Sequence, residues 1–490
     1  MSLSTAASSA SKVFEEIPTG SAVDTLLKRL QDRSATVGVI GLGYVGLPIA
    51  VMSAEAFAAA IGFDVQRERA EQLNQGYSEI QDVEKRAIAS LIARNKILGT
   101  TDFARVRECD VIVICVPTPL NNTKDPDLSY IDSAAHHIAA NLRPGQLVVL
   151  ESTTYPGTTD ELLLPLFEKS GLLLDHDFLL AFSPERVDPG STVSLQTIPK
   201  IVGGCSELST QAACEFYGAL FDSVHPVSNA RAAETVKLLE NTFRLVNIGL
   251  INEFAILCER LGIDTNEIIA GAATKPFGFM PFYPGPGVGG HCIPLDPLYL
   301  NWKAKQHGAV SRFIELADDV NTKMPVHVVE LVTQALNDSG KALRNARVLV
   351  VGVAYKANIG DIRQSPAIPI IDQLRLKGAI VAYHDPHVPV LDIDLHGWTE
   401  WRRRANVAVE RRHLRAAHAD GQPRRRRYDR LTNVSLDVAT LEDVDCVVIL
   451  SKHNGIDYSK IARHARVVID TRNAISAELR KTAAGRIVQL

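Results

Sequence analysis

Residues 37–48 read Val37-Gly38-Val39-Ile40-Gly41-Leu42-Gly43-Tyr44-Val45-Gly46-Leu47-Pro48, near the start of the 490-residue chain. A short apolar run leads into a glycine-rich turn, and the residues after the turn can open a helix. In a nucleotide-binding βαβ unit the first glycine, Gly41, makes the tight turn. The second, Gly43, lets backbone amides approach a pyrophosphate, and the third, Gly46, lets helix and strand pack closely. The stretch therefore predicts a dinucleotide site that also includes Tyr44 and Val45.

A carboxylate is expected about 20 residues beyond such a turn, where it binds a ribose 2′-hydroxyl. Asp64 lies 18 residues after Gly46, at the end of the next apolar run. An acid at this place favours NAD over NADP. The stretch 54–61 has no helix-stopping glycine between the expected helix and the second strand, and such a shortened connection can shift Asp64 slightly.

Outward from this turn, the apolar pattern changes twice along the chain. Short apolar runs first alternate with helix-like stretches, which is typical of a parallel α/β sheet. The rhythm then stops, and residues 232–262 carry apolar side chains three and four apart, which predicts one long helix ended by Gly262. We predict an α/β fold with two Rossmann-like doubly wound domains joined by a long central helix. The predicted segments are an N-terminal tail (1–35), an NAD-binding domain (36–225), a central helical dimerisation domain (226–335) and a second α/β domain (336–490).

Composition argues against several classes of protein. The 52 Lys and Arg nearly balance the 56 Asp and Glu, so the net charge of -4 gives no overall case for nucleic-acid or membrane binding. No uncharged apolar run approaches the roughly 18 residues of a membrane helix, and the first 20 residues lack the apolar core of a signal peptide. The seven cysteines are scattered and odd in number, which fits reduced thiols. We expect a cytoplasmic protein without a metal site.

One basic segment interrupts the second α/β pattern. Residues 400–430 hold eleven arginines, four of them consecutive at 424–427, against four acids. Since this segment has no hydrophobic period, we interpret residues 398–430 as a solvated surface insertion. The alternative is an arm that binds nucleic acid or another polyanion.

A second glycine-dense stretch delivers one cysteine: Pro284-Gly-Pro-Gly-Val-Gly-Gly-His291-Cys292-Ile-Pro-Leu-Asp296-Pro297. Six of the nine residues before Cys292 are Gly or Pro, which is poor material for a core and good material for a loop that offers backbone amides to a ligand. We expect Cys292 at the start of a helix, where the dipole stabilises a thiolate. Asp296, four residues on, would share its face. The alternative is a buried, inert thiol.

Taken in order, eight stretches of the chain resemble the UDP-sugar 6-dehydrogenase family, covering roughly residues 36–395 and 432–476. They are GLGYVGLPIA, VPTPL, ESTTYPGTT, FSPERVDPG, PKIVGG, ETVKLLENTFRLVNIGLINE, GPGVGGHCIPLDP and GVAYKANIGDIRQSP. Within the family, Ile293 and Leu295 resemble the UDP-N-acetylhexosamine branch, because the UDP-glucose enzymes tend to have Phe and Lys there. The resemblance implies NAD as cofactor and UDP-N-acetylglucosamine as substrate, with UDP-N-acetylgalactosamine, UDP-N-acetylmannosamine and UDP-glucose as alternatives.

The resemblance also implies a mechanism in which Cys292 traps an aldehyde as a thiohemiacetal and then carries a thioester. Lys237 and Asn241 share a helix face at i and i+4 and match the family's pattern for stabilising the oxyanion. Asp296 would act as base, while Glu185 and Thr154 would order the hydrolytic water and the sugar. Further residues expected to bind NAD are Pro117, Thr118 and Thr154. Those expected to bind the substrate are Glu185, Arg186, Lys237, Asn241, Phe282, Gly285, Gly289, Lys356 and Arg363.

Two other functions remain open from the sequence. A 3-hydroxyacid dehydrogenase also joins a Rossmann domain to long helices, but it needs neither Cys292 nor a second α/β domain and would release one NADH per substrate. A non-catalytic protein that senses NAD or a UDP-sugar would be expected to lose part of the catalytic set. All six of those residues are present: Thr154, Glu185, Lys237, Asn241, Cys292 and Asp296.

Overall fold

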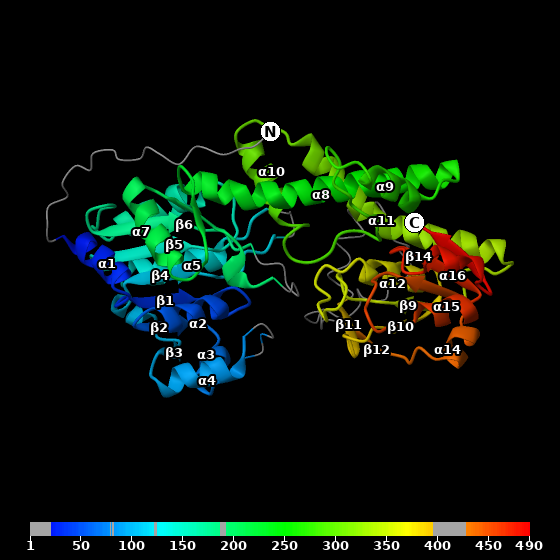
Figure 1. Ribbon diagram of the computed structural model, residues 1–490, viewed down its shortest axis with the longest axis horizontal. Coiled ribbons are helices and arrows are strands. Elements are labelled where there is room, and N and C mark those ends of the chain that lie inside the picture. The colour runs from blue at the N-terminus through cyan, green and yellow to red at the C-terminus, as the bar shows by residue number, and fades with distance from the viewer. Residues whose placement is uncertain (1–20, 79, 81–82, 122–124, 187–192, 395–427) are drawn as a thin grey trace, which may run out of the picture. The chain divides into compact units, whose positions relative to one another are not determined.

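The computed structural model describes residues 21–490 apart from 79, 81–82, 122–124, 187–192 and 395–427 (Figure 1). It contains two compact units. The first comprises residues up to Thr118 together with Asp127–Lys237, and the second comprises Pro119–Pro126 and Leu238–Leu490. The division falls inside α8 (Ala230–Leu261), the long helix that the sequence predicted. This helix ends at the expected place, because Gly262 adopts a left-handed φ of 69°.

The first unit is built on an eight-stranded sheet of order β3-β2-β1-β4-β5-β6-β7-β8. Neighbouring strands are parallel except β6 and β7, which are antiparallel. The strand order reverses between β1 and β4, and this is the switch point at which such sheets bind ligands. The strands are β1 (Thr36–Ile40), β2 (Ala59–Phe63), β3 (Ile97–Thr100), β4 (Val111–Ile114), β5 (Gln146–Leu150), β6 (Phe178–Phe182), β7 (Lys200–Gly204) and β8 (Val224–Pro226).

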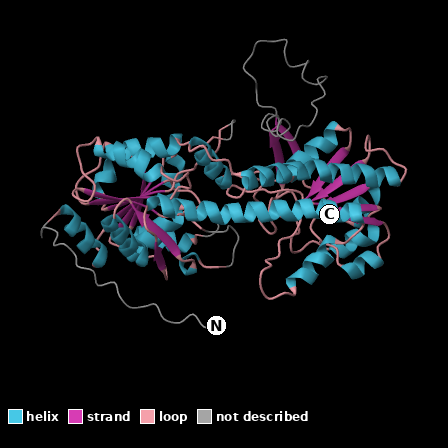
Figure 2. Cartoon of the chain, turned by 90° about the horizontal axis from the view of Figure 1, so that it is seen from above, coloured by secondary structure: helices cyan, strands magenta, loops and turns pink. Residues whose placement is uncertain are grey.

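Helices cover both faces of this sheet, as Figure 2 shows. Successive strand residues point to opposite faces, so Val111 and Val113 pack with α1, α2, α4 and α7, while Ile112 and Ile114 pack with α5, α6 and the first turns of α8. The two apolar clusters make the unit doubly wound. Its helices are α1 (Ala22–Gln31), α2 (Gly46–Ala56), α3 (Arg67–Asn74), α4 (Lys85–Ala93), α5 (Ser129–Ala139), α6 (Leu164–Glu168) and α7 (Glu207–Gly218).

Helix α1 lies inside the range 1–35 that the sequence analysis placed in a tail. Ser21 and Asp24 form a reciprocal capping box at its start, and Leu26 and Leu30 are buried in the core. Residues 22–31 are therefore part of the folded unit, contrary to the prediction. Residues 1–20 lie outside the described part of the chain.

The second unit contains a parallel five-stranded sheet of order β10-β9-β13-β14-β15. Helices α11 and α12 pack on one face, and α14, α15 and α16 pack on the other. The predicted boundary at residue 335 falls inside α11, and the division into separate central and second α/β domains stays a prediction. The strands are β9 (Arg347–Val351), β10 (Ile380–His384), β13 (Cys446–Ile449), β14 (Val467–Asp470) and β15 (Arg486–Gln489). The helices are α9 (Thr265–Ala273), α10 (Asp296–Gln306), α11 (Arg312–Asp338), α12 (Ala367–Leu376), α14 (Val438–Asp443), α15 (Tyr458–His464) and α16 (Ala477–Lys481).

A small antiparallel hairpin flanks the basic segment. It consists of β11 (Val390–Asp394) and β12 (Tyr428–Thr432). Most of the predicted insertion, residues 398–427, lies outside the described residues, but 428–430 belong to β12 and not to the insertion. Within the part of the chain that the structure describes, no helix has the length and apolar character needed to span a membrane.

Candidate functional site

The glycine turn after β1 has the geometry that its sequence predicted. Gly41 has a left-handed φ of 95°, and a Cβ atom added there would lie 2.6 Å from the Cys115 carbonyl oxygen. A Cβ atom at Gly46 would lie 1.9 Å from the Gly41 carbonyl oxygen, whereas one at Gly43 would meet nothing within 4 Å. Close packing therefore requires glycine at positions 41 and 46, whereas Gly43 leaves one side of the turn open.

Asp64 is held directly beside this turn. The Leu42 amide donates to Asp64 Oδ2 at 3.0 Å, and the Gln66 amide donates to Oδ1 at 2.8 Å. The helix–strand connection is indeed short, since α2 ends at Ala56 and β2 begins at Ala59. Gly41 N still donates to Phe63 O at 2.7 Å, so the shortened connection does not carry Asp64 away from the turn.

These features fit NAD. Helix α2 begins at Gly46 without a side-chain cap, which leaves backbone amides at its first turn for a pyrophosphate. Tyr44 is exposed in the turn. Just beyond the neighbouring strand β4, Pro117 is exposed and Thr118 is buried. The buried Asp64 carboxylate lies where an adenosine ribose is expected.

Lys237 on α8 donates to the hydroxyl of Thr153 at 2.7 Å. The sequence analysis had named the next residue, Thr154, whose side chain is fully buried and lies 2.6 Å from the Thr158 hydroxyl. Two adjacent threonines cannot be told apart from the sequence, because the direction of each side chain depends on how the chain turns after β5. The structure pairs Lys237 with Thr153.

The turn that carries Thr153 is fixed by Glu234, three residues before Lys237 on α8. This buried carboxylate accepts hydrogen bonds from Gly157 N at 2.6 Å, Thr159 N at 2.9 Å and the Thr159 hydroxyl at 2.7 Å. Burial raises the pKa of Glu234 to about 7, although these donors oppose the rise. Glu234 thus ties α8 to the turn and stabilises the Lys237–Thr153 pairing. The sequence analysis gave it no role.

Glu185 and Arg186 follow β6. The Glu185 side chain is nearly buried, and its Oε2 lies 3.6 Å from Lys200 Nζ. Arg186 donates to the Pro199 carbonyl at 2.7 Å. The first unit thus supplies Lys237 from α8, and Thr153 and Glu185 from the loops that follow β5 and β6.

In the second unit, Asn241, Asp296 and Cys292 come together. Asn241 Nδ2 donates to Asp296 Oδ2 at 2.6 Å, and both residues are buried. The Asn241 carbonyl oxygen accepts from Arg244, so both ends of the amide are used. The Asp296 amide donates to the Cys292 carbonyl at 2.8 Å. Because α10 begins at Asp296, Cys292 lies in the turn that precedes the helix and not at the helix start, where the sequence analysis had placed it.

The glycines before Cys292 also serve close packing. A Cβ atom at Gly289 would lie 2.6 Å from Tyr355 Cβ, and one at Gly290 would lie 2.8 Å from the Tyr355 ring. Gly290 N donates to Arg363 O at 3.0 Å. The cysteine loop therefore packs on the loop that carries two of the predicted substrate residues, Lys356 and Arg363. Arg363 forms an ion pair with Asp361 at 2.6 Å, and Phe282 packs edge-on against Phe243.

The loop with Lys356 is held by a buried pair, Asp385 and His453. Asp385 Oδ2 accepts from Val353 N at 2.7 Å and from His453 Nε2 at 3.1 Å, while His453 Nδ1 accepts from Asn358 N at 2.9 Å. Burial opposes the charge of Asp385, but the hydrogen bonds from His453 and from the His387 and Ala354 amides outweigh it and lower its pKa to about 2. His453, to which the sequence analysis assigned nothing, thus holds both this carboxylate and the loop.

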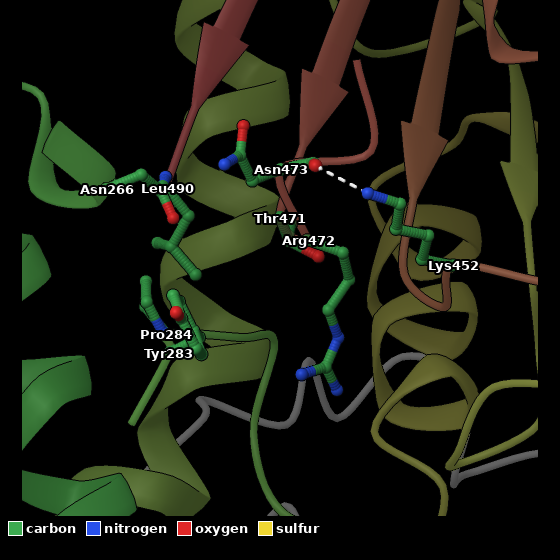
Figure 3. Close-up of a pocket in the computed structure, with 8 residues that line it drawn as sticks. All are labelled: Asn266, Tyr283, Pro284, Lys452, Thr471, Arg472, Asn473 and Leu490. Carbon is green, nitrogen blue, oxygen red and sulfur yellow. Dashed lines mark hydrogen bonds between the residues drawn. The ribbon is translucent and has the colours of Figure 1, made fainter. Parts of the chain in front are cut away.

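A pocket opens at the carboxyl ends of β13 and β14 (Figure 3). The Arg472 guanidinium points into it, with Nε donating to Leu450 O at 3.0 Å, and burial lowers its pKa to about 10. Among the described residues, no carboxylate pairs with Arg472. Lys452 donates to Asn473 O at 3.1 Å on the same rim. Two cations at this sheet edge suit a phosphate. The pocket is lined by Asn266, Tyr283, Pro284, Lys452, Thr471, Arg472, Asn473 and Leu490.

Only a weak signal in the sequence points to this pocket. Arg472 directly follows Asp470-Thr471 at the end of β14, and no spacing rule singles out an arginine at this place. Gly285, predicted as a substrate residue, is packed against it, because a Cβ atom there would lie 2.4 Å from an Arg472 guanidinium nitrogen.

Comparison with known proteins matches three parts of the chain, in order, to the three domains of one family. Residues 35–221, 231–323 and 349–477 match the NAD binding, central and UDP binding domains of the UDP-glucose/GDP-mannose dehydrogenase family. A UDP-N-acetyl-D-glucosamine 6-dehydrogenase of Pseudomonas aeruginosa is 35% identical over 421 residues, which cover 84% of this chain and 97% of the relative.

Two solved structures are similar over nearly the full length. The UDP-D-ManNAc dehydrogenase of Pyrococcus horikoshii has a TM-score of 0.77 at 31% identity and covers 93% of this chain and 98% of its own. An NDP-N-acetyl-D-galactosaminuronic acid dehydrogenase from Methanosarcina mazei Go1 has a TM-score of 0.75 at 30% identity, with 96% and 98% covered.

Proposed function

Because the chain belongs to the UDP-glucose/GDP-mannose dehydrogenase family and is an NAD-dependent UDP-sugar dehydrogenase, we propose that it oxidises C6 of UDP-N-acetylglucosamine to a carboxylate. The Pseudomonas relative named for this substrate supports the choice, as do Ile293 and Leu295 after the cysteine. The Pyrococcus and Methanosarcina neighbours are named for other N-acetylhexosamines. UDP-N-acetylmannosamine, UDP-N-acetylgalactosamine and UDP-glucose are therefore the alternatives.

The observation that carries the mechanism is the turn that joins Cys292 to Asp296, with Asn241 hydrogen-bonded to the same carboxylate. The alcohol first loses a hydride and its hydroxyl proton, which leaves an aldehyde at C6. The Cys292 thiolate adds to this carbon, and the oxygen takes up a proton to give a thiohemiacetal. The thiohemiacetal then loses the second hydride together with its hydroxyl proton and becomes a thioester. Water then attacks the thioester carbon, the C–S bond breaks, and carboxylate and thiol are released. NAD, when bound, accepts the hydride at each oxidation.

Polar and charged side chains stabilise the oxyanion, accept protons and orient the water. Lys237, held by Thr153, and the Asn241 amide are donors that can stabilise negative charge developing on the C6 oxygen. Asp296 is buried with one oxygen bound to Asn241, and it can accept a proton from an alcohol or a water. Glu185 would orient the water for thioester hydrolysis.

The nucleotide end of the substrate would bind in the second unit. Arg472 and Lys452 line the pocket at the sheet edge and would meet the diphosphate. Lys356 and Arg363 lie on the loop that packs against the cysteine loop and would contact the sugar side.

The exposed face of α8 supports a homodimer. Five large apolar residues of this helix are between 46% and 63% exposed, at intervals of four and seven residues: Leu239, Phe243, Leu250, Leu257 and Leu261. An apolar stripe of this kind on a long helix suits a second copy of the same helix. A cytoplasmic location also stays a prediction, as does the interpretation of residues 398–430 as a solvated surface insertion, with a polyanion-binding arm as the alternative.

The test is NADH release from a panel of UDP-sugars. We expect UDP-N-acetylglucosamine to give the highest kcat/KM and two NADH per sugar, without free aldehyde. Cys292→Ser should abolish turnover while NAD binding persists, and Cys214→Ser on α7, a partly buried cysteine outside the site, should retain activity. One NADH per sugar would contradict the covalent mechanism, and higher kcat/KM on another sugar would reassign the substrate.

A further inference from the structure

A buried ionic cluster in the first unit contains two residues, Lys200 and Glu151, that have no role in the mechanism described above. Lys200 is the first residue of β7, and its side chain is 4% exposed. Its Nζ lies 3.0 Å from Glu151 Oε1 and 3.6 Å from Glu185 Oε2. Fully burying a lysine is costly unless its charge is paired. Here the pairing joins a residue proposed to act on water, Glu185, to one that lies deeper, Glu151.

The antiparallel step in the sheet creates this cluster. Strand β7 runs opposite to β6, with Ala181 opposite Gly204 and Phe182 opposite Gly203. Continuing that register brings residue 200 opposite residue 185, at the carboxyl edge of β6. A parallel β7 would have placed Lys200 at the other edge of the sheet. Glu151 reaches the same edge because it directly follows the parallel neighbour β5.

Neutral and aromatic groups complete the surroundings of Lys200 and Glu151. Tyr217 on α7 donates to Glu151 Oε1 at 2.5 Å, and the Cys115 thiol lies 3.9 Å from Glu151 Oε2. Burial raises the pKa of Tyr217 and of Cys115 well above their usual values, so both stay neutral. The Tyr217 and Phe221 rings face the ammonium at 5.0 and 5.1 Å. One cation therefore serves two carboxylates.

Burial and pairing act against each other in this cluster. Burial raises the pKa of Glu151, opposed by Lys200. Burial also lowers the pKa of Lys200, but Glu151 and Glu185 outweigh this effect and leave it above its usual value. Lys200 is thus held charged, and without it two carboxylates would face each other in a nearly dry space.

We propose that Lys200 is a positioning residue for thioester hydrolysis: anchored by Glu151, it keeps the Glu185 carboxylate ionised and in place for the attacking water. This inference rests on the proposed function, because Glu185 needs its charge to accept the hydrogen bond that orients that water. Removing Lys200 forces the two carboxylates to share a proton, as like charges in one site do. Glu185 then loses its charge over part of the working pH range.

The experiment compares Lys200→Met with the double variant Lys200→Met/Glu151→Gln and with Glu151→Gln. For Lys200→Met we expect a fast burst of NADH followed by slow turnover, with a thioester accumulating on Cys292 that mass spectrometry detects. The acid limb of its kcat profile should move up by about one pH unit or more. The double variant has a single carboxylate, so the limb should move back. An unchanged limb in Lys200→Met, or no return in the double variant, would overturn the proposal.

Two further readouts keep the test decisive. In Glu151→Gln the ammonium serves Glu185 alone, so the acid limb should move down, and an upward move would contradict the proposal even if Lys200→Met fails to fold. Thermal unfolding of Lys200→Met should show stability falling as pH rises, because a proton is bound more tightly in the folded state, and the double variant should lose this trend. Failure of the proposed function would appear separately, as one NADH per sugar in the unmodified enzyme.

Discussion

Replacing Gly46 by alanine tests the geometry of the cofactor turn. The new Cβ atom would lie 1.9 Å from the Gly41 carbonyl oxygen, and real Cβ atoms essentially never approach a neighbour closer than 3.0 Å. The turn or the helix must therefore move by about 1.1 Å. Overpacking of this kind costs about 1–3 kcal/mol of stability, which corresponds to a fall in Tm of roughly 2–12 °C for a domain of this size.

The same movement displaces the backbone amides that would meet the pyrophosphate. Losing one hydrogen bond to a charged group costs about 1.5–3 kcal/mol, so the Kd for NAD should rise roughly 10- to 100-fold. Gly43→Ala separates the two effects, because its Cβ atom meets nothing within 4 Å and its φ is not left-handed. It should keep the Tm and still weaken NAD binding, since the methyl group occupies the open side of the turn.

The control is Gly218→Ala, the same change at the end of α7, where the added Cβ also meets nothing. There the Tm should not fall and the Kd for NAD should not rise. Calorimetric titration with NAD and thermal unfolding measure both quantities on each variant. Unchanged NAD affinity and Tm in Gly46→Ala would refute the close approach of helix and turn, and unchanged affinity in Gly43→Ala would refute the placement of the pyrophosphate.

Three further predictions concern other parts of the chain. The folded pKa of Glu234, about 7, lies above its usual value, so stability should fall by up to about 3 kcal/mol as pH rises from 5 to 8, and urea unfolding of Glu234→Gln should lack this fall. Leu250→Arg on α8 should halve the mass measured by light scattering. A monomer mass for the protein without this substitution would contradict the dimer. Replacing 398–427 by a short linker should leave kcat and KM within about twofold, and loss of UDP-sugar binding would place that segment in the substrate site.

The fold could be predicted from the sequence because each strand or helix depends on a pattern of only a few neighbouring residues. Apolar runs separated by helix-like stretches predicted both sheets, and apolar residues three and four apart predicted α8 with its end at Gly262. The glycine turn was equally local, since the sterics of Gly41 and Gly46 depend on backbone within the same βαβ unit. Helix α1 was not predicted, because ten residues of mixed character reveal a buried face only when the sheet beneath them is known.

The sequence by itself determined the fold class, the cofactor turn and the cysteine loop, because those depend on residues close together in the chain. Only the tertiary structure decided which threonine meets Lys237, since the direction of a side chain after β5 depends on a turn fixed by Glu234 on α8. It also decided that Lys200 lies beside Glu185: the antiparallel direction of β7 leaves no mark on its own sequence, yet it places a buried ammonium at the functional edge of the sheet.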